Sequence, residues 1–182
     1  MKRRILPLLL LCALLLSGCG TKKEEARFRR FAEDLAARQT LSFRCRLRAD
    51  WPDRRTDFTL SFSRDEEGDA VTVLAPESIA GITARLTEAG GSLCYDDLIL
   101  DLGALDAAGL SPVGALPLLV NAMAGAHLDS CWSEDGQAVY ALTVDDDRSV
   151  RVWFTPENMV PRRAQLLSGG RAVITCEIED WR

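Results

Sequence analysis

Groups that carry enzyme chemistry are scarce in this chain. Its 182 residues include one histidine, His127, and neither a Cys-x-x-Cys motif nor a Gly-x-Ser-x-Gly turn. Zinc, redox and serine-hydrolase sites therefore lack their usual residues, and we expect no enzyme activity, no metal and no other cofactor. The run Asp145–Asp147 offers carboxylates to calcium, but aspartates between two strands are more typical of a solvated turn.

The chain also lacks an apolar run of the roughly 20 residues that a membrane-spanning helix needs. The nearest candidate, Ile5–Leu16, is shorter and follows three basic residues, which is the form of a secretory signal. It ends in Leu-Ser-Gly-Cys at 16–19, which resembles the lipobox of bacterial lipoproteins. That resemblance implies a signal peptide at 1–18, a lipid anchor on Cys19 and a lipidated tether at 19–24. The alternative is an ordinary cleaved signal with an incidental cysteine.

Basic residues are outnumbered, with 22 Lys and Arg against 27 Asp and Glu. Removal of residues 1–18 takes away three basic residues and no acidic one, which leaves 19 against 27, a net charge of −8. Such an acidic chain is a poor partner for nucleic acid, so we expect none. The remaining length suits one domain with its own core, and we assign residues 25–182 to it.

Four cysteines remain once Cys12 and Cys19 are set aside, namely Cys45, Cys94, Cys131 and Cys176. An exported protein permits two disulfides among them, in three possible connectivities. The alternative is buried free thiols, because Cys45 and Cys176 each lie within an apolar alternation.

A helical pattern follows the anchor. Residues 22–38 place Phe28, Phe31 and Leu35 at helical spacing among charged residues, which predicts an amphipathic helix. Its basic residues either contact anionic lipid headgroups near the anchor or are offset by its acidic residues while the helix packs on the domain.

A second helical segment lies in the middle of the chain. Between residues 111 and 127 nearly every side chain is apolar, so a helix there must be buried. We expect it to run from about Ala115 to Gly125, with Pro117 in its first turn, where the missing N–H costs nothing.

The rest of the chain alternates between apolar and polar residues. In residues 41–49 every odd position is apolar and every even position is Ser or Arg. Similar alternations, separated by turn residues, predict about ten strands in one antiparallel sheet, with two helices in an α+β fold. Trp153 falls on the outer face in this pattern and marks either a partner patch or a side chain partly covered by a loop.

A long sheet of this kind curls, because neighbouring strands rotate by roughly 20°, and its apolar face becomes a concave trough. Apolar area left uncovered there is worth about 25 cal/mol per Å² to a ligand such as an acyl chain. The candidate lipid-binding residues are Phe43, Phe58, Leu60, Phe62, Val71, Val73, Leu116, Leu119 and Met123. The alternative is that these side chains form a closed core.

Two segments resemble a known family. Residues 150–163, VRVWFTPENMVPRR, are similar to the late strand, turn and strand of the LolA/LolB superfamily of lipoprotein carriers and receptors, and residues 74–82, LAPESIAGI, to an earlier strand and loop. The resemblance implies a non-enzymatic open half-barrel, closed by helices, whose interior receives acyl chains. Diffusing carriers of the family have no anchor, so Cys19 favours a fixed, receptor-like or regulatory member, and no arginine here matches the family's latch.

These observations together predict an extracytoplasmic, membrane-anchored lipoprotein that binds acyl chains or the lipid moieties of lipoproteins, in lipoprotein sorting or lipid handling. Anchored relatives act in germination and other relatives bind regulatory proteins. The alternative is therefore a non-enzymatic scaffold or regulator that binds an envelope protein, such as a cell-wall or germination factor.

The lipid anchor is tested by intact-mass analysis of protein extracted from membranes. We expect a chain that begins at Cys19 and carries added lipid mass, because the lipobox directs both cleavage and acylation. An unmodified species at that position would refute the anchor.

Overall fold

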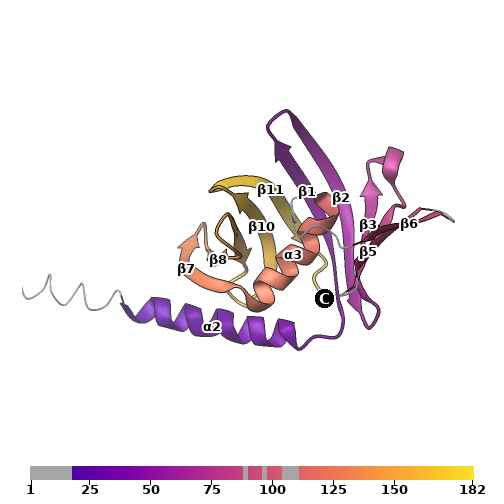
Figure 1. The fold of residues 1–182 in the computed structure, drawn as a ribbon. Coiled ribbons are helices and arrows are strands. Elements are labelled where there is room, and N and C mark those ends of the chain that lie inside the picture. Colours follow the sequence, from indigo (N-terminus) through magenta and orange to yellow (C-terminus); the bar gives the residue numbers. More distant parts are fainter. Residues whose placement is uncertain (1–17, 88–89, 96–97, 104–110) are drawn as a thin grey trace, which may run out of the picture.

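The computed structural model describes residues 18–182 except 88–89, 96–97 and 104–110. Residues 1–17 of the predicted signal peptide lie outside the described residues. In Figure 1 the N-terminal helix points away from the body of the molecule at its first residue, so the predicted anchor lies at one end of the molecule.

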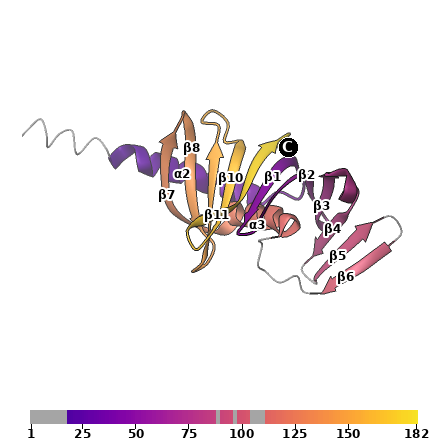
Figure 2. The same cartoon turned by 90° about the horizontal axis from the view of Figure 1, so that it is seen from above.

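One antiparallel sheet makes up most of the described chain (Figures 1 and 2). Its eleven strands are β1 (Leu41–Trp51), β2 (Arg54–Asp65), β3 (Gly68–Ala75), β4 (Thr83–Thr87), β5 (Gly90–Tyr95), β6 (Leu98–Gly103), β7 (His127–Glu134), β8 (Gln137–Thr143), β9 (Arg148–Phe154), β10 (Pro161–Ser168) and β11 (Arg171–Glu179). Their spatial order is β6-β5-β4-β3-β2-β1-β11-β10-β9-β8-β7. The prediction of a single antiparallel sheet is confirmed, with eleven strands where about ten were expected.

The alternation in the sequence sets the two faces of this sheet. In β1 the side chains of Leu41, Phe43, Cys45, Leu47 and Ala49 are buried, while the Ser and Arg residues between them are exposed. Successive strand residues point to opposite faces, so one face carries the core and the other faces solvent. Strand β1 pairs with β11, so the first and last strands of the chain lie side by side at the centre of the sheet.

Two α-helices lie in the described part of the chain, α2 (Gly18–Ala36) and α3 (Pro112–Gly125), with a short 3₁₀ turn, η1 (Glu77–Ile79), after β3. Helix α3 contacts β3, β8 and β10, which belong to both halves of the sheet. The sheet therefore bends around α3. Helix α2 runs beside α3 and against β7 along one side of the molecule (Figure 1). Both predicted helices are confirmed.

Helix α3 begins earlier than the sequence suggested. We expected a start near Ala115, with Pro117 in the first turn, but the helix begins at Pro112 and Pro117 lies inside it. The reason is the cap: the Ser111 hydroxyl accepts a hydrogen bond from the Gly114 N–H at 3.0 Å, and Pro112 takes the first helical position.

Polar contacts also hold α3 in place. Asn121, the polar residue in this apolar helix, accepts a hydrogen bond from the Arg64 guanidinium of β2 at 2.9 Å. The same guanidinium binds Asp69 of β3 at 2.6 and 2.8 Å. A single arginine thus links α3 to two strands of the sheet.

Candidate functional site

The predicted lipid-binding residues come together on the concave face of the sheet. Eight of them are at most 6% exposed, and the ninth, Phe58, is partly buried and packs against the same core. Helix α3 supplies Leu116, Leu119 and Met123 from within the bend of the sheet. Most of these side chains are inaccessible to a ligand in this conformation, and their role in lipid binding stays a prediction.

Aromatic rings fasten α2 over this face. The Phe28 ring stacks on Tyr140 of β8 with 4.7 Å between centroids, and Phe31 meets Phe154 of β9 edge-on at 4.9 Å. Tyr140 and Phe154 are themselves in edge contact at 5.5 Å. Such pairs add about 0.5–1.5 kcal/mol each beyond the area that they bury. The helical spacing of Phe28 and Phe31 predicted a packed helix, but not which strands it covers.

Two polar contacts complete the attachment of α2. The Tyr140 hydroxyl donates a hydrogen bond to the Glu24 carboxylate at 2.9 Å, and Arg27 donates to the Pro156 carbonyl in the β9–β10 turn. Burial, together with the hydrogen bond to Glu24, raises the pKa of Tyr140 well above its usual value, so the phenol is the donor at neutral pH. Sequence reasoning missed these residues, because neither contact has a signal in residue spacing.

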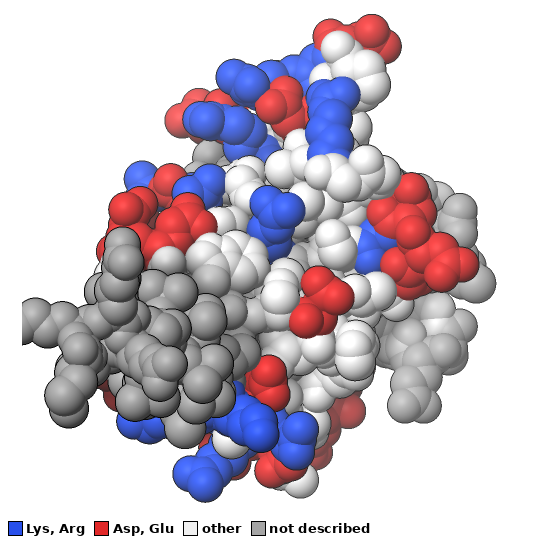
Figure 3. All heavy atoms as spheres, turned by 90° about the vertical axis from the view of Figure 1, so that its left-hand side faces the viewer, with Lys and Arg blue, Asp and Glu red and all other residues white. Residues whose placement is uncertain are grey.

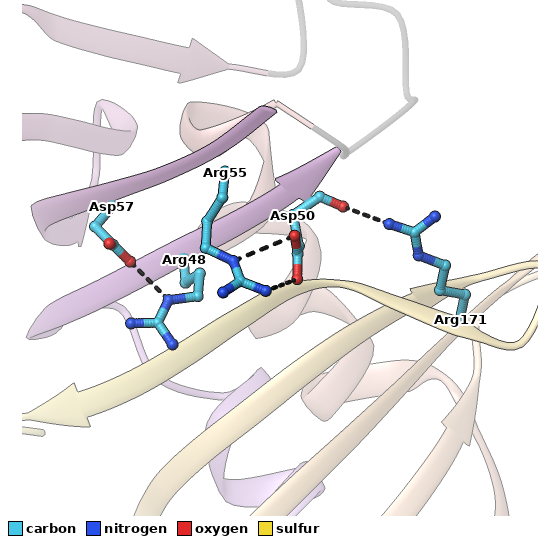
Figure 4. A network of polar contacts seen from close by, with 5 residues as sticks. All are labelled: Arg48, Asp50, Arg55, Asp57 and Arg171. Carbon is cyan, nitrogen blue, oxygen red and sulfur yellow. Dashed lines mark hydrogen bonds and ion pairs between the residues drawn. The ribbon is translucent and has the colours of Figure 1, made fainter. Parts of the chain in front are cut away.

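The solvent face of the central strands is a row of paired charges. Arg48 binds Asp57 at 2.8 Å, and Arg55 binds Asp50 at 2.9 Å, while Arg171 of β11 donates to the Asp50 carbonyl (Figure 4). The hydrogen bond from Arg55 lowers the pKa of Asp50 below its usual value. Arginines on this face are thus occupied by neighbouring carboxylates and offer little charge to an external ligand.

The end of the molecule at which α2 begins carries charges of both signs. Figure 3 shows Lys and Arg next to Asp and Glu along the margins of this face, with mostly uncharged atoms across its middle. Mixed margins of this kind differ from the continuous basic patch that a nucleic-acid-binding domain presents.

Trp153 lies on the outer face as predicted, but it is only 5% exposed. The guanidinium of Arg163, its cross-strand partner on β10, stacks over the indole ring at 4.8 Å from the centroid. The possibility of an open tryptophan patch for a partner is therefore wrong. The indole is covered, by an arginine of the adjacent strand and not by the loop that the sequence suggested.

The Asp145–Asp147 run forms a turn. The Asp145 carboxylate accepts hydrogen bonds from the backbone N–H groups of Asp147 and Arg148 at 3.1 and 2.8 Å. Within the ranges that the structure describes, no group of three His, Cys, Asp or Glu side chains is arranged to hold a metal ion.

The cysteines cannot form two internal disulfides. The register of β1 and β11 places Cys45 diagonally from Cys176, whereas Cys94 on β5 and Cys131 on β7 each stand four strand positions from the nearest other cysteine of the sheet. Strands are about 4.8 Å apart, and a disulfide needs Cα atoms within about 7 Å. Cys45, Cys94 and Cys176 are free thiols in the structure. The hydrogen bond with Cys176 and burial raise the pKa of Cys45 well above its usual value.

An exposed apolar patch lies at the far end of the sheet from α2, on the edge strand β6 (Figure 2). Leu98, Ile99 and Leu100 are 72%, 73% and 56% exposed, and Tyr95 of the neighbouring β5 is 46% exposed. An edge strand leaves backbone N–H and C=O groups unpaired, and consecutive exposed aliphatic residues there are unusual.

Among the residues described, no helix is both long and apolar enough to span a bilayer.

The attachment of α2 is tested by Tyr140→Phe, which removes the hydroxyl that binds Glu24. Because the Glu24 carboxylate is partly exposed and returns to water, we expect a loss of about 1 kcal/mol in the free energy of unfolding. Amide hydrogen exchange along α2 should become faster. The matched control is Tyr95→Phe at the chain's other tyrosine, which is exposed on β5, and unchanged exchange in α2 of the Tyr140 variant would contradict this attachment.

Comparisons with known proteins complete the description. No family model matches the chain. No curated protein matches it either. Solved structures do match. An uncharacterized conserved protein from Thermus thermophilus is 8% identical with a TM-score of 0.51, covering 87% of this chain and 86% of that one.

Two further solved structures also match the chain. A LolA superfamily protein from Nitrosomonas europaea is 13% identical with a TM-score of 0.46, covering 85% of this chain and 92% of that one. A chain of the complex between the CwlD amidase and the GerS lipoprotein of Clostridioides difficile is 11% identical with a TM-score of 0.47, covering 87% and 94%. The predicted resemblance to LolA-superfamily structures is confirmed, and at these identities it concerns the fold alone.

Proposed function

We propose that this protein is a non-enzymatic, membrane-anchored lipoprotein outside the cytoplasm, which binds the acyl chains of a lipid or of another lipoprotein beneath helix α2. The observation that carries the proposal is the construction of the sheet. Strands β1–β3 and β8–β11 of the eleven-stranded sheet present the buried core on one apolar concave face, and in the described part of the chain two α-helices cover it. Each square ångström of apolar surface that a moving helix uncovers and a ligand then covers contributes about 25 cal/mol to the free energy of binding.

The form of the attachment supports α2 as the moving cover. Helix α3 is buried on nearly all sides and held by Arg64, whereas the outer side of α2 faces solvent. The polar contacts that join α2 to the rest of the described chain include the hydrogen bond of Tyr140 to Glu24 and the one from Arg27 to Pro156. Release of these contacts and of the Phe28 and Phe31 rings would expose the core face, at a cost that a bound acyl chain can repay.

The position of the anchor supports the same function. Helix α2 begins at Gly18 and includes Cys19, the predicted site of lipidation, and the segment predicted as a tether. Diacylation at this position would hold the cover helix at the membrane surface, because two or more acyl chains make the attachment stable. The cover would then open beside the source of its ligand.

The acyl-binding function is tested by displacement of a fluorescent fatty acid from the full-length protein. We expect saturable binding, and we expect Tyr140→Phe to speed association, because its α2 is held less firmly. Tyr95→Phe should leave association unchanged. An absence of saturable binding would remove the lipid-handling function.

A second candidate function is a scaffold or regulator that binds an envelope protein. The observation that favours it is the β6 edge, where Leu98, Ile99 and Leu100 are exposed in succession. An extended segment of a partner can pair with such an edge through backbone hydrogen bonds and cover its apolar side chains. This function requires no movement of α2.

Crosslinking of the anchored protein in its own membrane, followed by mass spectrometry of lipid and protein eluates, separates the two functions. We expect lipid crosslinked to residues of the concave face. A single protein crosslinked at β6, with no lipid in the core, would instead establish the scaffold function.

A further inference from the structure

A groove runs along one side of α2, where the helix faces the β9–β10 turn and strands β7 and β8. It consists of two hollows, with volumes of about 280 and 330 Å³, that share Arg27. We call it the α2 groove. The first hollow is lined by Arg27, Arg30, Phe31, Asp34, Leu35, Arg38, Asn158, Met159, Val160 and Trp181, and the second by Lys23, Glu24, Arg27, Cys131, Trp132, Ser133, Ala138 and Pro156.

The charges of the α2 groove oppose the charge of the protein as a whole. Four basic side chains line it, Lys23, Arg27, Arg30 and Arg38, against the two acidic side chains Glu24 and Asp34. Glu24 is already engaged, since it accepts the hydrogen bond of Tyr140 and lies 4.0 Å from Arg27. The groove is therefore a local basic site on an acidic protein.

Two of these arginines lack the carboxylate partners that arginines have elsewhere. On the solvent face of β1 and β2, Arg44, Arg46, Arg48 and Arg55 each form an ion pair with a carboxylate. Among the described residues, Arg30 and Arg38 lie within 4.0 Å of no carboxylate oxygen. Both are exposed, Arg30 on α2 and Arg38 two residues beyond the end of that helix. Their forked donors are free to bind the oxygens of an anion.

The floor of the groove is apolar. Phe31, Leu35, Met159 and Trp181 line the hollow that carries Arg30 and Arg38, and all four pack on the buried core. A ligand bound here would meet guanidinium groups at the rim and aromatic or aliphatic side chains beneath them. This combination matches an amphiphile, with an anionic head and an apolar chain, better than a free inorganic anion.

We propose that the α2 groove binds the anionic headgroup of the lipid whose acyl chains enter beneath α2. This inference rests on the proposed acyl-binding function and adds to it the class of lipid: phosphate-bearing headgroups with net negative charge, in preference to zwitterionic ones. Arg30 and Arg38 hold the headgroup oxygens, and the apolar floor leads the chain toward the core next to Leu35.

The test uses the full-length protein reconstituted in phosphatidylcholine vesicles that contain one of two photoactivatable lipids. Both carry the same photoreactive acyl chain; one is a phosphatidylglycerol and the other a phosphatidylcholine. After irradiation, labelled peptides are mapped by mass spectrometry. We expect the phosphatidylglycerol probe to label α2 and residues 156–160, and to do so more strongly than the phosphatidylcholine probe.

Variants identify the residues responsible. Arg30→Gln with Arg38→Gln should reduce labelling by phosphatidylglycerol about fivefold, because two solvent-exposed ionic contacts are lost. The matched control is Arg29→Gln with Arg151→Gln, which removes the same net charge from exposed positions outside the groove. We expect it to label as the wild type does.

Each other outcome overturns a distinct claim. Equal labelling by the two probes, or an equal loss in the control variant, refutes the headgroup site and leaves the acyl-binding function standing. Labelling confined to surfaces away from α2 and the concave face refutes both. A phosphate monoester without an acyl chain, glycerol phosphate, should not compete at the concentration of the lipid probe, and full competition would show a site for a free anion instead.

Discussion

The structure depends on the need to cover one apolar face of a very wide sheet. Alternation gives the central strands a buried side and a wet side, and right-handed twist turns the eleven-stranded sheet into a curve. The curve is filled by α3, whose surface is apolar on nearly all sides. Helix α2 then closes the open side, and its position decides how much of the core can meet a ligand.

Helix α2 combines three roles that are usually separate. Its buried side places Phe28 and Leu35 in the core, its first residues include the predicted lipidation site, and one flank carries the basic rim of the α2 groove. Movement of this helix would therefore change core exposure and the geometry of the groove together. This coupling is why we place the lipid chain and its headgroup at the same element.

Whether an arginine of this protein forms an ion pair depends on the elements next to it. Arginines on the solvent face of β1 and β2 form ion pairs with carboxylates on adjacent strands. This face therefore presents little net charge. Of the arginines that line the α2 groove, Arg27 lies 4.0 Å from Glu24, whereas Arg30 and Arg38 lie within 4.0 Å of no described carboxylate oxygen and face Asn158 and Met159 across the groove. Net charge alone would have hidden this difference, since the protein is acidic overall.

The sequence by itself determined the strands, their faces and the two helices, because period-two and helical patterns report which side of each element is buried. It identified the candidate lipid-binding row, including Phe62 and Leu119, as one apolar set. Only the tertiary structure decided that the strand residues of this row pack against those of α3, that Trp153 is covered by Arg163, and that Tyr140 meets Glu24. These contacts join residues on different elements, and local periodicity carries no information about which elements meet.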